Sequence, residues 1–427
     1  MDNPHLEKKP KIFYGYWIVL ATFFCAFMDS AAGYYAFSLF VKPLEAAFGW
    51  SRGEIMLGWT ARFLAVGLFS PFIGRLVDRY GARSVIAIGA IVAGFGFVFL
   101  SQMQNIWYFY IGWVVIGIAM AATGMIPASS VVSRWFIKRR GTALGIMGVG
   151  FGAGGVLSPL IGGYLIPTFG WRISYIALAP LMWVLFPLAL LVIKTKPADM
   201  GLYPYGVEAP ETVPEDKPEA PPSTPKGASL RMAFATSGFW LIAISFLLGS
   251  FGETGVTQSQ VPYLEDIGFP VAIAASTLAV VGIVSAISKS IFGWLCDRIA
   301  PKYARAIGLG ALVVATGLLL NVRLSSPPAL LWIYSVIKGF GAGSWLPTVS
   351  MLISTTFGLA SYGVILGVVA FAQSVGNGVG PLFAAYIYDT TGSYYWAFIS
   401  IIGLIVVSIL AVVAVRRPES LQYSEGV

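Results

Sequence analysis

Apolar residues form long, continuous stretches along this chain, and polar residues are confined mostly to the shorter segments between them. Because an α-helix rises about 1.5 Å per residue, about 20 apolar residues cross the hydrocarbon core of a bilayer. An outer-membrane barrel would show short segments of alternating hydrophobicity instead, so the pattern predicts an all-α membrane protein. The pattern predicts twelve transmembrane helices, at approximately 14–40, 52–74, 83–102, 106–133, 141–166, 172–193, 236–262, 271–296, 304–323, 328–357, 362–388 and 394–415.

The composition agrees with this prediction. Of the 427 residues, 57% are hydrophobic and 11% are charged, whereas soluble domains carry about 25% charged residues. Cys25 and Cys296 fall within or at the end of apolar segments, which argues against a disulfide framework. The only histidine, His5, precedes the first predicted helix, so we expect no histidine metal site. We expect neither a metal nor a cofactor.

The basic residues are distributed unevenly among the loops. If the loops are numbered alternately from the N-terminus, one side holds twenty Lys and Arg residues, among them Arg75, Arg134 and Arg305, and the other side holds four. The positive-inside rule makes the first side cytoplasmic, with both termini inside. Because the net charge of +8 is spread over short loops, it does not indicate nucleic-acid binding. We expect a multi-pass protein of the plasma membrane, of the bacterial inner-membrane kind.

One polar stretch, residues 195–232, is longer than the others and is rich in proline, glutamate and lysine. This composition cannot bury a hydrophobic core. It predicts a flexible cytoplasmic linker between an N-terminal six-helix bundle over residues 1–194 and a C-terminal six-helix bundle over residues 233–427.

The two predicted bundles are related in sequence. The segment Gly74-Arg-Leu-Val-Asp78-Arg79 recurs as Gly293-Trp-Leu-Cys-Asp297-Arg298, and other matches also lie close to 220 residues apart. This offset indicates a duplication. Parallel repeats of this kind are typical of a transporter architecture with its substrate site at the bilayer midplane, between the halves.

Three segments carry a resemblance to a known family. The loop from Gly74 to Arg83, Gly-Arg-Leu-Val-Asp-Arg-Tyr-Gly-Ala-Arg, resembles the G-x-L-x-D-R-x-G-R/K motif of the major facilitator superfamily. The segments Tyr14-Gly-Tyr-Trp17 and Arg134-Trp-Phe-Ile-Lys-Arg-Arg-Gly-Thr-Ala-Leu-Gly145 are similar to its monocarboxylate porter and oxalate–formate antiporter branch.

The resemblance implies two pseudo-symmetric six-helix bundles and secondary transport of a small carboxylate by alternating access. Proton-coupled symport of a monocarboxylate such as lactate or pyruvate is the favoured prediction. Exchange of small dicarboxylates and transport of another small organic solute are the alternatives. The expected partners are the substrate, protons and the lipid bilayer, and we expect a monomer. No nucleophile motif or nucleotide-binding loop is present in the sequence, so neither an enzyme nor a primary pump is expected.

The repeated loop motif predicts a conformational latch on the cytoplasmic side. A carboxylate at a helix end and arginines on the adjoining turn can bind one bundle to the other, and breaking such pairs would switch the state. The alternative is that these charges serve topology alone. The predicted latch residues are Gly74, Asp78, Arg79, Arg83, Gly293, Asp297 and Arg298.

Ionisable residues within membrane spans are candidates for function because an unpaired charge in hydrocarbon is costly. Lys289 lies eight residues before Asp297, about 12 Å along a helix, which places it near the midplane. In the resembled branch a cation on span eight, usually arginine, pairs with the substrate carboxylate. Lysine supplies a point charge in place of a bidentate fork. Lys289 is therefore a candidate substrate cation, or alternatively part of an ion pair between helices.

Lys338 is also near the midplane, on span ten. It is a candidate second contact with the anion, which would favour a dicarboxylate, or a partner of Glu253. The oxalate-exchanging relatives place their second cation on span eleven, and no cation lies near Gln373 in this sequence. This absence counts against oxalate itself.

Asp29, Arg62 and Glu253 are candidates for proton coupling or gating, since a carboxylate near a substrate cation can titrate when its partner is engaged elsewhere. An Asp29–Arg62 salt bridge is the structural alternative. Tyr34 and Tyr35 are candidates to bond the substrate carboxylate, or alternatively belong to an interfacial aromatic belt.

Trp345 is a candidate wall of the substrate cavity, with a packing role as the alternative. It lies in span ten, seven residues after Lys338.

Overall fold

The computed structural model of the chain describes residues 13–206, 230–358 and 362–416, and this part is built of helices and connecting loops with one isolated β-bridge, Phe136–Tyr205. The first crossing is irregular. It runs through α1 (Gly15–Asp29), the π-helix η1 (Ser30–Tyr35), the 3₁₀-helix η2 (Phe37–Phe40) and α2 (Val41–Phe48).

The rest of the first half contains the long helices α3 (Arg52–Tyr80) and α4 (Ala82–Ser101), a crossing divided into α5 (Ile106–Thr123) and α6 (Met125–Trp135), and a series of shorter helices. The shorter helices are α7 (Arg140–Ala153), η3 (Gly154–Leu157), α8 (Ser158–Leu160), η4 (Ile161–Leu165), α9 (Ile166–Trp183), α10 (Leu185–Leu191) and η5 (Pro197–Met200).

The second half has longer unbroken helices. They are α11 (Leu230–Phe234), α12 (Ser237–Asp266), α13 (Val271–Cys296), α14 (Pro301–Asn321), α15 (Pro328–Gly343), α16 (Trp345–Phe357), α17 (Tyr362–Thr391) and α18 (Tyr395–Val413).

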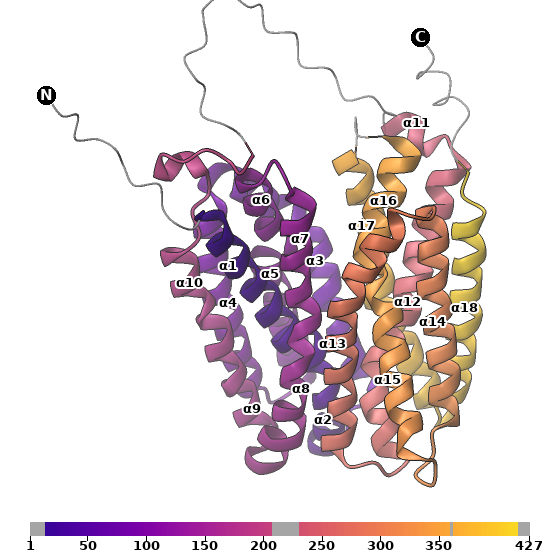
Figure 1. Cartoon of the computed structure of the whole chain (residues 1–427). Coiled ribbons are helices and arrows are strands. Elements are labelled where there is room, and N and C mark those ends of the chain that lie inside the picture. Colours follow the sequence, from indigo (N-terminus) through magenta and orange to yellow (C-terminus); the bar gives the residue numbers. More distant parts are fainter. Residues whose placement is uncertain (1–12, 207–229, 359–361, 417–427) are drawn as a thin grey trace, which may run out of the picture.

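Within the described residues these helices make twelve crossings. Eleven helical stretches are long and apolar enough to span a membrane, and one of them, Gly141–Leu191, has 51 residues. A single helix of that length would measure about 77 Å, more than twice the bilayer core of about 30 Å. The chain leaves helical geometry at Gly170, where φ is +77°, and this stretch therefore crosses twice. The predicted all-α fold of twelve helices in two six-helix bundles is confirmed, and Figure 1 shows the two bundles side by side.

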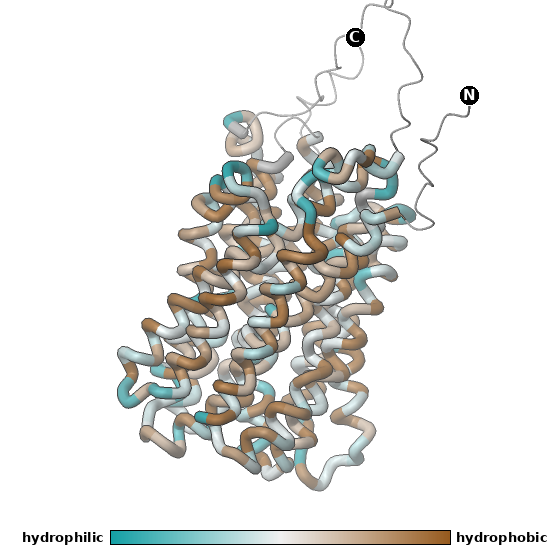
Figure 2. Tube along the Cα trace, turned by 90° about the vertical axis from the view of Figure 1, so that its left-hand side faces the viewer, coloured by the Kyte–Doolittle hydropathy of each residue, from teal (hydrophilic) through white to brown (hydrophobic). Residues whose placement is uncertain are grey.

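We call the end of the molecule where α10 ends and α12 begins the linker side, which is uppermost in Figure 1, and the opposite end the far side. Large apolar side chains such as Phe72, Leu191 and Leu410 are 58%, 73% and 65% exposed, as expected where helices face lipid. Figure 2 shows hydrophobic residues over most of the length of the bundles, with the most hydrophilic ones mainly near their ends. Most of the predicted linker, residues 207–229, and both chain ends, residues 1–12 and 417–427, lie outside the described residues, and the domain boundaries stay a prediction.

The repeat is visible in the helix breaks. In the first half, Gly124 separates α5 from α6, and in the second half Ser344 separates α15 from α16. These two positions lie 220 residues apart, at the offset of the sequence repeat. The fourth and tenth crossings are therefore each interrupted near the middle of the membrane.

The two halves pack closely toward the far side and separate toward the linker side. On α7, a side-chain carbon at Gly152 would lie 2.8 Å from the Ala286 backbone nitrogen in the other half, whereas one at Gly145 would meet nothing within 4 Å. On α3, a carbon at Gly67 would reach Phe371 of α17 at 3.8 Å, and one at Gly74 would again meet nothing. The molecule is therefore closed on the far side and open on the linker side.

Candidate functional site

A run of polar residues begins about halfway along α12, which is otherwise largely apolar. From Glu253 to Gln260 the sequence reads Glu-Thr-Gly-Val-Thr-Gln-Ser-Gln, and every residue after Glu253 is buried. Polar side chains that faced lipid would lose their hydrogen bonds at a cost of several kcal/mol. This stretch therefore faces protein, and the candidate site is built around it.

Glu253 joins the two halves of the molecule. Its carboxylate accepts hydrogen bonds from the Tyr34 hydroxyl, at 3.1 Å to Oε2, and from the Thr257 hydroxyl, at 3.2 Å to Oε1. The Gln258 side chain donates to the Tyr34 backbone carbonyl at 3.2 Å. Tyr34 lies in η1, and single π-helical turns are frequent at functional sites. A carboxylate and an amide of α12 thus bind η1 of the other half.

Lys338 is bound by neutral groups of its own half. Its Nζ donates to Gln260 Oε1 at 2.6 Å, and the Tyr334 hydroxyl donates to the same oxygen at 2.6 Å. The Gln260 amide nitrogen donates to Thr277 at 3.1 Å. Among the described residues Lys338 forms no ion pair with Glu253 or any other carboxylate. Lys338 is 1% exposed, and its charge is enclosed by the second bundle.

Lys289 is held by a weaker hydrogen bond than Lys338. It lies on α13, is 8% exposed, and its Nζ donates to the Ser285 hydroxyl at a long 3.4 Å. The four ion pairs found in the described part of the chain do not include Lys289. An ammonium group carries three donors, so this buried cation has capacity for a further acceptor.

Asp29 and Arg62 do not form the alternative salt bridge in this state. Asp29 Oδ1 accepts from the Thr123 hydroxyl at 3.0 Å, while Arg62 Nε and Nη2 lie 3.3 and 3.2 Å from the sulfur of Met120. Arg62 Nη1 is buried and has no hydrogen-bond partner, and the guanidinium carbon lies 5.1 Å from the ring centre of Trp59. The two charges thus contact neighbouring turns of α5, and their predicted role in coupling or gating stays a prediction.

The aromatic candidates lie inside the protein. Tyr34 and Tyr35 are 6% and 4% exposed, so in this state neither lies in an exposed interfacial belt. Trp345 begins α16 directly after the break at Ser344, and its indole N–H is buried without a partner. Their predicted contacts with substrate stay predictions.

The sequence reasoning missed two parts of this region. Arg305 was counted among the basic residues of the loops, but the structure buries it to 3% exposure in α14, where Nη1 donates to the Ser344 hydroxyl at 3.1 Å. Gln258 and Gln260 were not singled out. The run of polar residues from Glu253 to Gln260 was the available signal for the glutamines, whereas Arg305 lies too near a helix end for hydropathy to place.

Five residues form what we call the far-side ion cluster: Lys42, Glu45, Arg52, Asp266 and Asp389. Arg52 binds Asp266 through two parallel hydrogen bonds of 2.7 and 2.9 Å, and its Nε lies 3.4 Å from Glu45. Lys42 also contacts Asp266, at 2.5 Å. Arg52 and Lys42 belong to the first half and Asp266 to the second, so this cluster joins the bundles on the far side.

Asp389 extends the cluster by capping a helix of the other half. Its carboxylate accepts from the backbone N–H groups of Arg52 and Gly53, at 3.1 and 2.7 Å, at the N-terminus of α3. A carboxylate is favourable there because the first N–H groups of a helix lack partners and the helix dipole is positive. The Arg52 guanidinium also lies 3.7 Å from the ring centre of Tyr388. The sequence patterns did not single out Arg52 as a candidate residue.

The predicted latch residues form no ion pair between the two bundles in this state, among the residues that the structure describes. Asp78 pairs with Arg134 of its own half at 3.1 Å, while Arg79 and Arg298 lie over the neighbouring rings of Tyr80 and Trp294. Arg83 is half-buried, Asp297 is exposed, and space surrounds Gly74 and Gly293. A latch between the bundles would require the linker side to close, so it stays a prediction. Within the described residues no three His, Cys, Asp or Glu side chains cluster as metal ligands.

Comparison with known proteins identifies the family. Residues 19–378 match the sequence model of the Major Facilitator Superfamily. The chain belongs to the major facilitator superfamily. As a member of this superfamily it is a transporter and not an enzyme.

Relatives within the superfamily include proteins named for the monocarboxylate branch that the motifs indicated, and a multidrug resistance protein. Monocarboxylate transporter 11 of Homo sapiens is 28% identical over 337 residues, which are 77% of this chain and 68% of that protein. Monocarboxylate transporter 12 of Mus musculus is 24% identical over 397 residues, 90% of this chain and 82% of that protein. The multidrug resistance protein MdtG of Klebsiella pneumoniae (strain 342) is 26% identical over 375 residues, 85% of this chain and 84% of that protein.

Solved structures of the superfamily share the fold. A bacterial homologue of the human lysosomal transporter Spinster, in an inward-facing and occupied conformation, superposes with a TM-score of 0.72 at 17% identity, over 97% of this chain and 99% of that chain. The nucleoside transporter NupG gives a TM-score of 0.71 at 13% identity, over 93% and 99%. At these identities the likeness concerns the fold alone.

Proposed function

We propose that this transporter carries a small monocarboxylate, of the lactate or pyruvate type, by alternating access. The observation that carries the proposal is the buried ammonium of Lys289, which donates a long hydrogen bond to a neutral hydroxyl and forms no ion pair within the described residues. A charge buried without a partner costs several kcal/mol. A substrate carboxylate at Nζ would supply the missing negative charge and acceptor, so binding an anion is favoured over binding a neutral solute.

The proposal specifies one carboxylate per substrate. Of the two lysines predicted to contact substrate, only Lys289 is available to bind a carboxylate, because Lys338 is already held by Gln260 at 2.6 Å. The Gln260 oxygen is occupied twice, by Lys338 and Tyr334, so releasing the lysine would break a connected network. The named monocarboxylate transporters among the relatives support the same substrate class.

The conformational state indicates which side of the membrane the site is open to. The basic loops of the sequence pattern lie on the linker side, so the positive-inside rule makes this side cytoplasmic. The opening on the linker side and the far-side ion cluster then describe a transporter open to the cytoplasm. In this proposal the far-side ion cluster must dissociate, and the linker side must close, before substrate exchanges on the other face.

Glu253 is the proposed proton site. As a carboxylate it accepts hydrogen bonds from Tyr34 and Thr257; protonation would remove one acceptor position and weaken the link between η1 and α12. A proton and a monocarboxylate moving together would carry no net charge. Strict exchange of anions is the alternative. Glu253 would then serve only to hold the two halves together through its hydrogen bond with Tyr34.

Uptake into proteoliposomes tests the proposed function. Lys289→Ala should lower carboxylate uptake about 10- to 100-fold, since a hydrogen bond to a charged group contributes about 1.5–3 kcal/mol. Lys289→Arg should retain part of the activity because it keeps the charge. Lys196→Ala, which removes an exposed linker-side lysine, is the matched control and should behave like wild type. Wild-type uptake by a folded Lys289→Ala protein would refute the assignment and leave a different solute as the substrate.

A further inference from the structure

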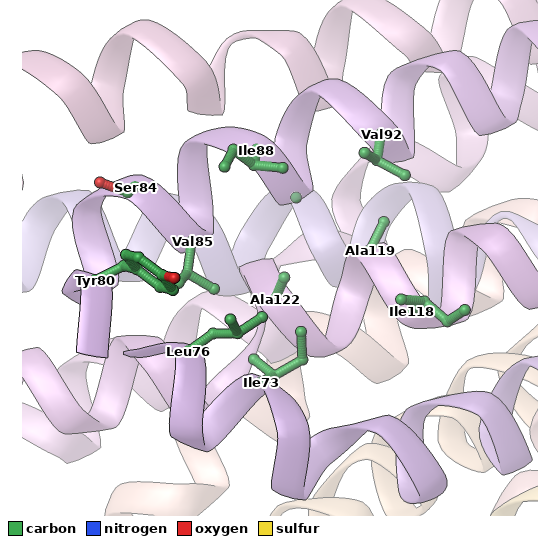
Figure 3. Close-up of a pocket in the computed structure, with 11 residues that line it drawn as sticks. Ile73, Leu76, Tyr80, Ser84, Val85, Ile88, Val92, Ile118, Ala119 and Ala122 are labelled. Carbon is green, nitrogen blue, oxygen red and sulfur yellow. The ribbon is translucent and has the colours of Figure 1, made fainter. Parts of the chain in front are cut away.

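An apolar groove runs along the outer surface of the first half, between α3, α4 and α5 (Figure 3). It has a volume of about 410 Å³. Leu76 of α3 and Ile88 of α4, on its two walls, are 41% and 63% exposed. The groove therefore opens outward, toward the space that lipid occupies around a membrane protein, and it lies apart from the candidate transport site.

Small residues at a helix contact form the floor of the groove. A side-chain carbon at Gly89 of α4 would lie 2.8 Å from the Ala122 side chain and 3.0 Å from the Ala119 carbonyl oxygen, both on α5. The helices can approach closely only because these residues are small. The larger side chains of Ile73, Leu76, Ile88 and Val92 lie on either side of this contact, so a furrow is left above it.

The groove matches one leaflet of a bilayer in its length and in having one polar end. It follows α4 from Ser84 to Val92, eight residues or about 12 Å, close to one leaflet of a hydrocarbon core of about 30 Å. Tyr80 and the exposed Ser84 lie at its linker-side end, and Figure 3 shows both hydroxyl groups there, while the rest of the lining is apolar. An amphiphile of one leaflet would match this arrangement.

The polar end of the groove is positively charged. Arg79 lies with its guanidinium carbon 5.1 Å from the ring centre of Tyr80, and Arg75 is one turn earlier on α3. The nearby carboxylate, Asp78, is already paired with Arg134. A negatively charged headgroup would therefore meet arginines with little competition, as in other basic sites at the membrane surface.

We propose that this groove binds an anionic phospholipid of the linker-side leaflet, with one acyl chain along α4 and the headgroup beside Tyr80, Ser84 and Arg79. Its floor residues Ala119 and Ala122 adjoin Met120 and Thr123, which contact Arg62 and Asp29. A bound lipid would thus hold α5 in the position that these buried charges use. The inference does not depend on the identity of the transported solute.

Native mass spectrometry of the delipidated protein tests this site. Phosphatidylglycerol and phosphatidylcholine with the same acyl chains are offered at equal concentration. The wild type should retain more phosphatidylglycerol. Ser84→Asp should lower that retention about fivefold relative to Ser84→Asn, because one charge near an anionic lipid surface is worth about 1 kcal/mol. The Asn variant is the neutral control of similar size.

A second pair of variants tests the acyl-chain part of the groove. Ile88→Trp should fill the groove and lower retention of phosphatidylglycerol, whereas Ile307→Trp, at a 46% exposed position on α14, should leave it unchanged. Circular dichroism and the melting temperature establish that both variants are folded. Equal retention of the two lipids by wild type, equal retention by the two Ser84 variants, or equal retention by the two tryptophan variants would each overturn the proposal.

Discussion

At the scale of single residues, the defining feature is a group of buried cations without anionic partners. Arg62, Lys289, Arg305 and Lys338 are between 1% and 8% exposed, and in the described part of the chain none of them forms an ion pair. Neutral acceptors satisfy Lys338 and in part Arg305, while Lys289 has one long hydrogen bond. Three of the four, Lys289, Arg305 and Lys338, lie in the second bundle. That bundle therefore holds buried positive charge, which an anionic substrate can offset.

The depth of these residues could be predicted from sequence, but their partners could not. Counting helical residues from Asp297 placed Lys289 well inside a span, and the structure buries it in α13. Whether Lys338 contacts Glu253 or Gln260 depends on the rotation of α15 about its own axis and on the neighbours that α12 presents. Hydropathy contains neither piece of information, so the pairing of Lys338 with Gln260 emerges only from the packed structure.

Glu253→Gln separates proton coupling from transport itself. Glutamine keeps an acceptor for Tyr34 and Thr257 but cannot ionise, so we expect uptake that no longer increases with an inward proton gradient while counterflow exchange continues. Initial rates at several external pH values measure this. Asp199→Asn, an exposed carboxylate on the linker side, is the control. If Glu253→Gln responds to the gradient as wild type does, the proton site is elsewhere.

At the scale of helices, the far-side ion cluster sets the balance between states. Asp266→Asn removes the carboxylate that binds both Lys42 and Arg52, so the population open on the far side should rise. Spin labels at Ala47→Cys and Ser325→Cys, in a background where the buried Cys25 and Cys296 are replaced by serine, report the separation of the bundles. Glu54→Gln is the matched control, since Glu54 caps α3 within its own half. An unchanged distance distribution for Asp266→Asn would show that the cluster does not hold this state.

The contact of α7 with α13 predicts opposite effects at two glycines of one helix. Gly152→Ala places a carbon 2.8 Å from the Ala286 backbone, and overpacking of this kind costs about 1–3 kcal/mol, so the melting temperature should fall. Gly145→Ala meets nothing within 4 Å and should raise it, because alanine favours a helix over glycine by up to about 1 kcal/mol. If α7 closes the linker side during transport, Gly145→Ala should also slow uptake. Equal melting temperatures for the two variants would contradict the packing described for α7.

At the scale of the whole molecule, length and hydropathy were sufficient for the fold. Twelve apolar segments and a repeat of about 220 residues predicted two six-helix bundles, which the structure has. The conformational state could not be predicted, because the same sequence must close on either side. The latch motif drew attention to the linker side, yet in this state the ion pairs between the bundles lie on the far side, in residues such as Arg52 and Asp266 that sequence reasoning left in loops or at helix ends.

The central claim is that an unpaired ammonium in the second bundle binds one carboxylate, and a binding measurement tests it most directly. The shift in melting temperature is measured with lactate, with its neutral amide lactamide, and with small dicarboxylates, for wild type and Lys289→Ala. Lactate should stabilise the wild type, and lactamide and the dicarboxylates should have little effect. Without ligand, Lys289→Ala should melt no lower than wild type, because it removes an unpaired buried charge, and it should gain nothing from lactate. Equal stabilisation by lactate and lactamide, or a full lactate shift in Lys289→Ala, would contradict the account.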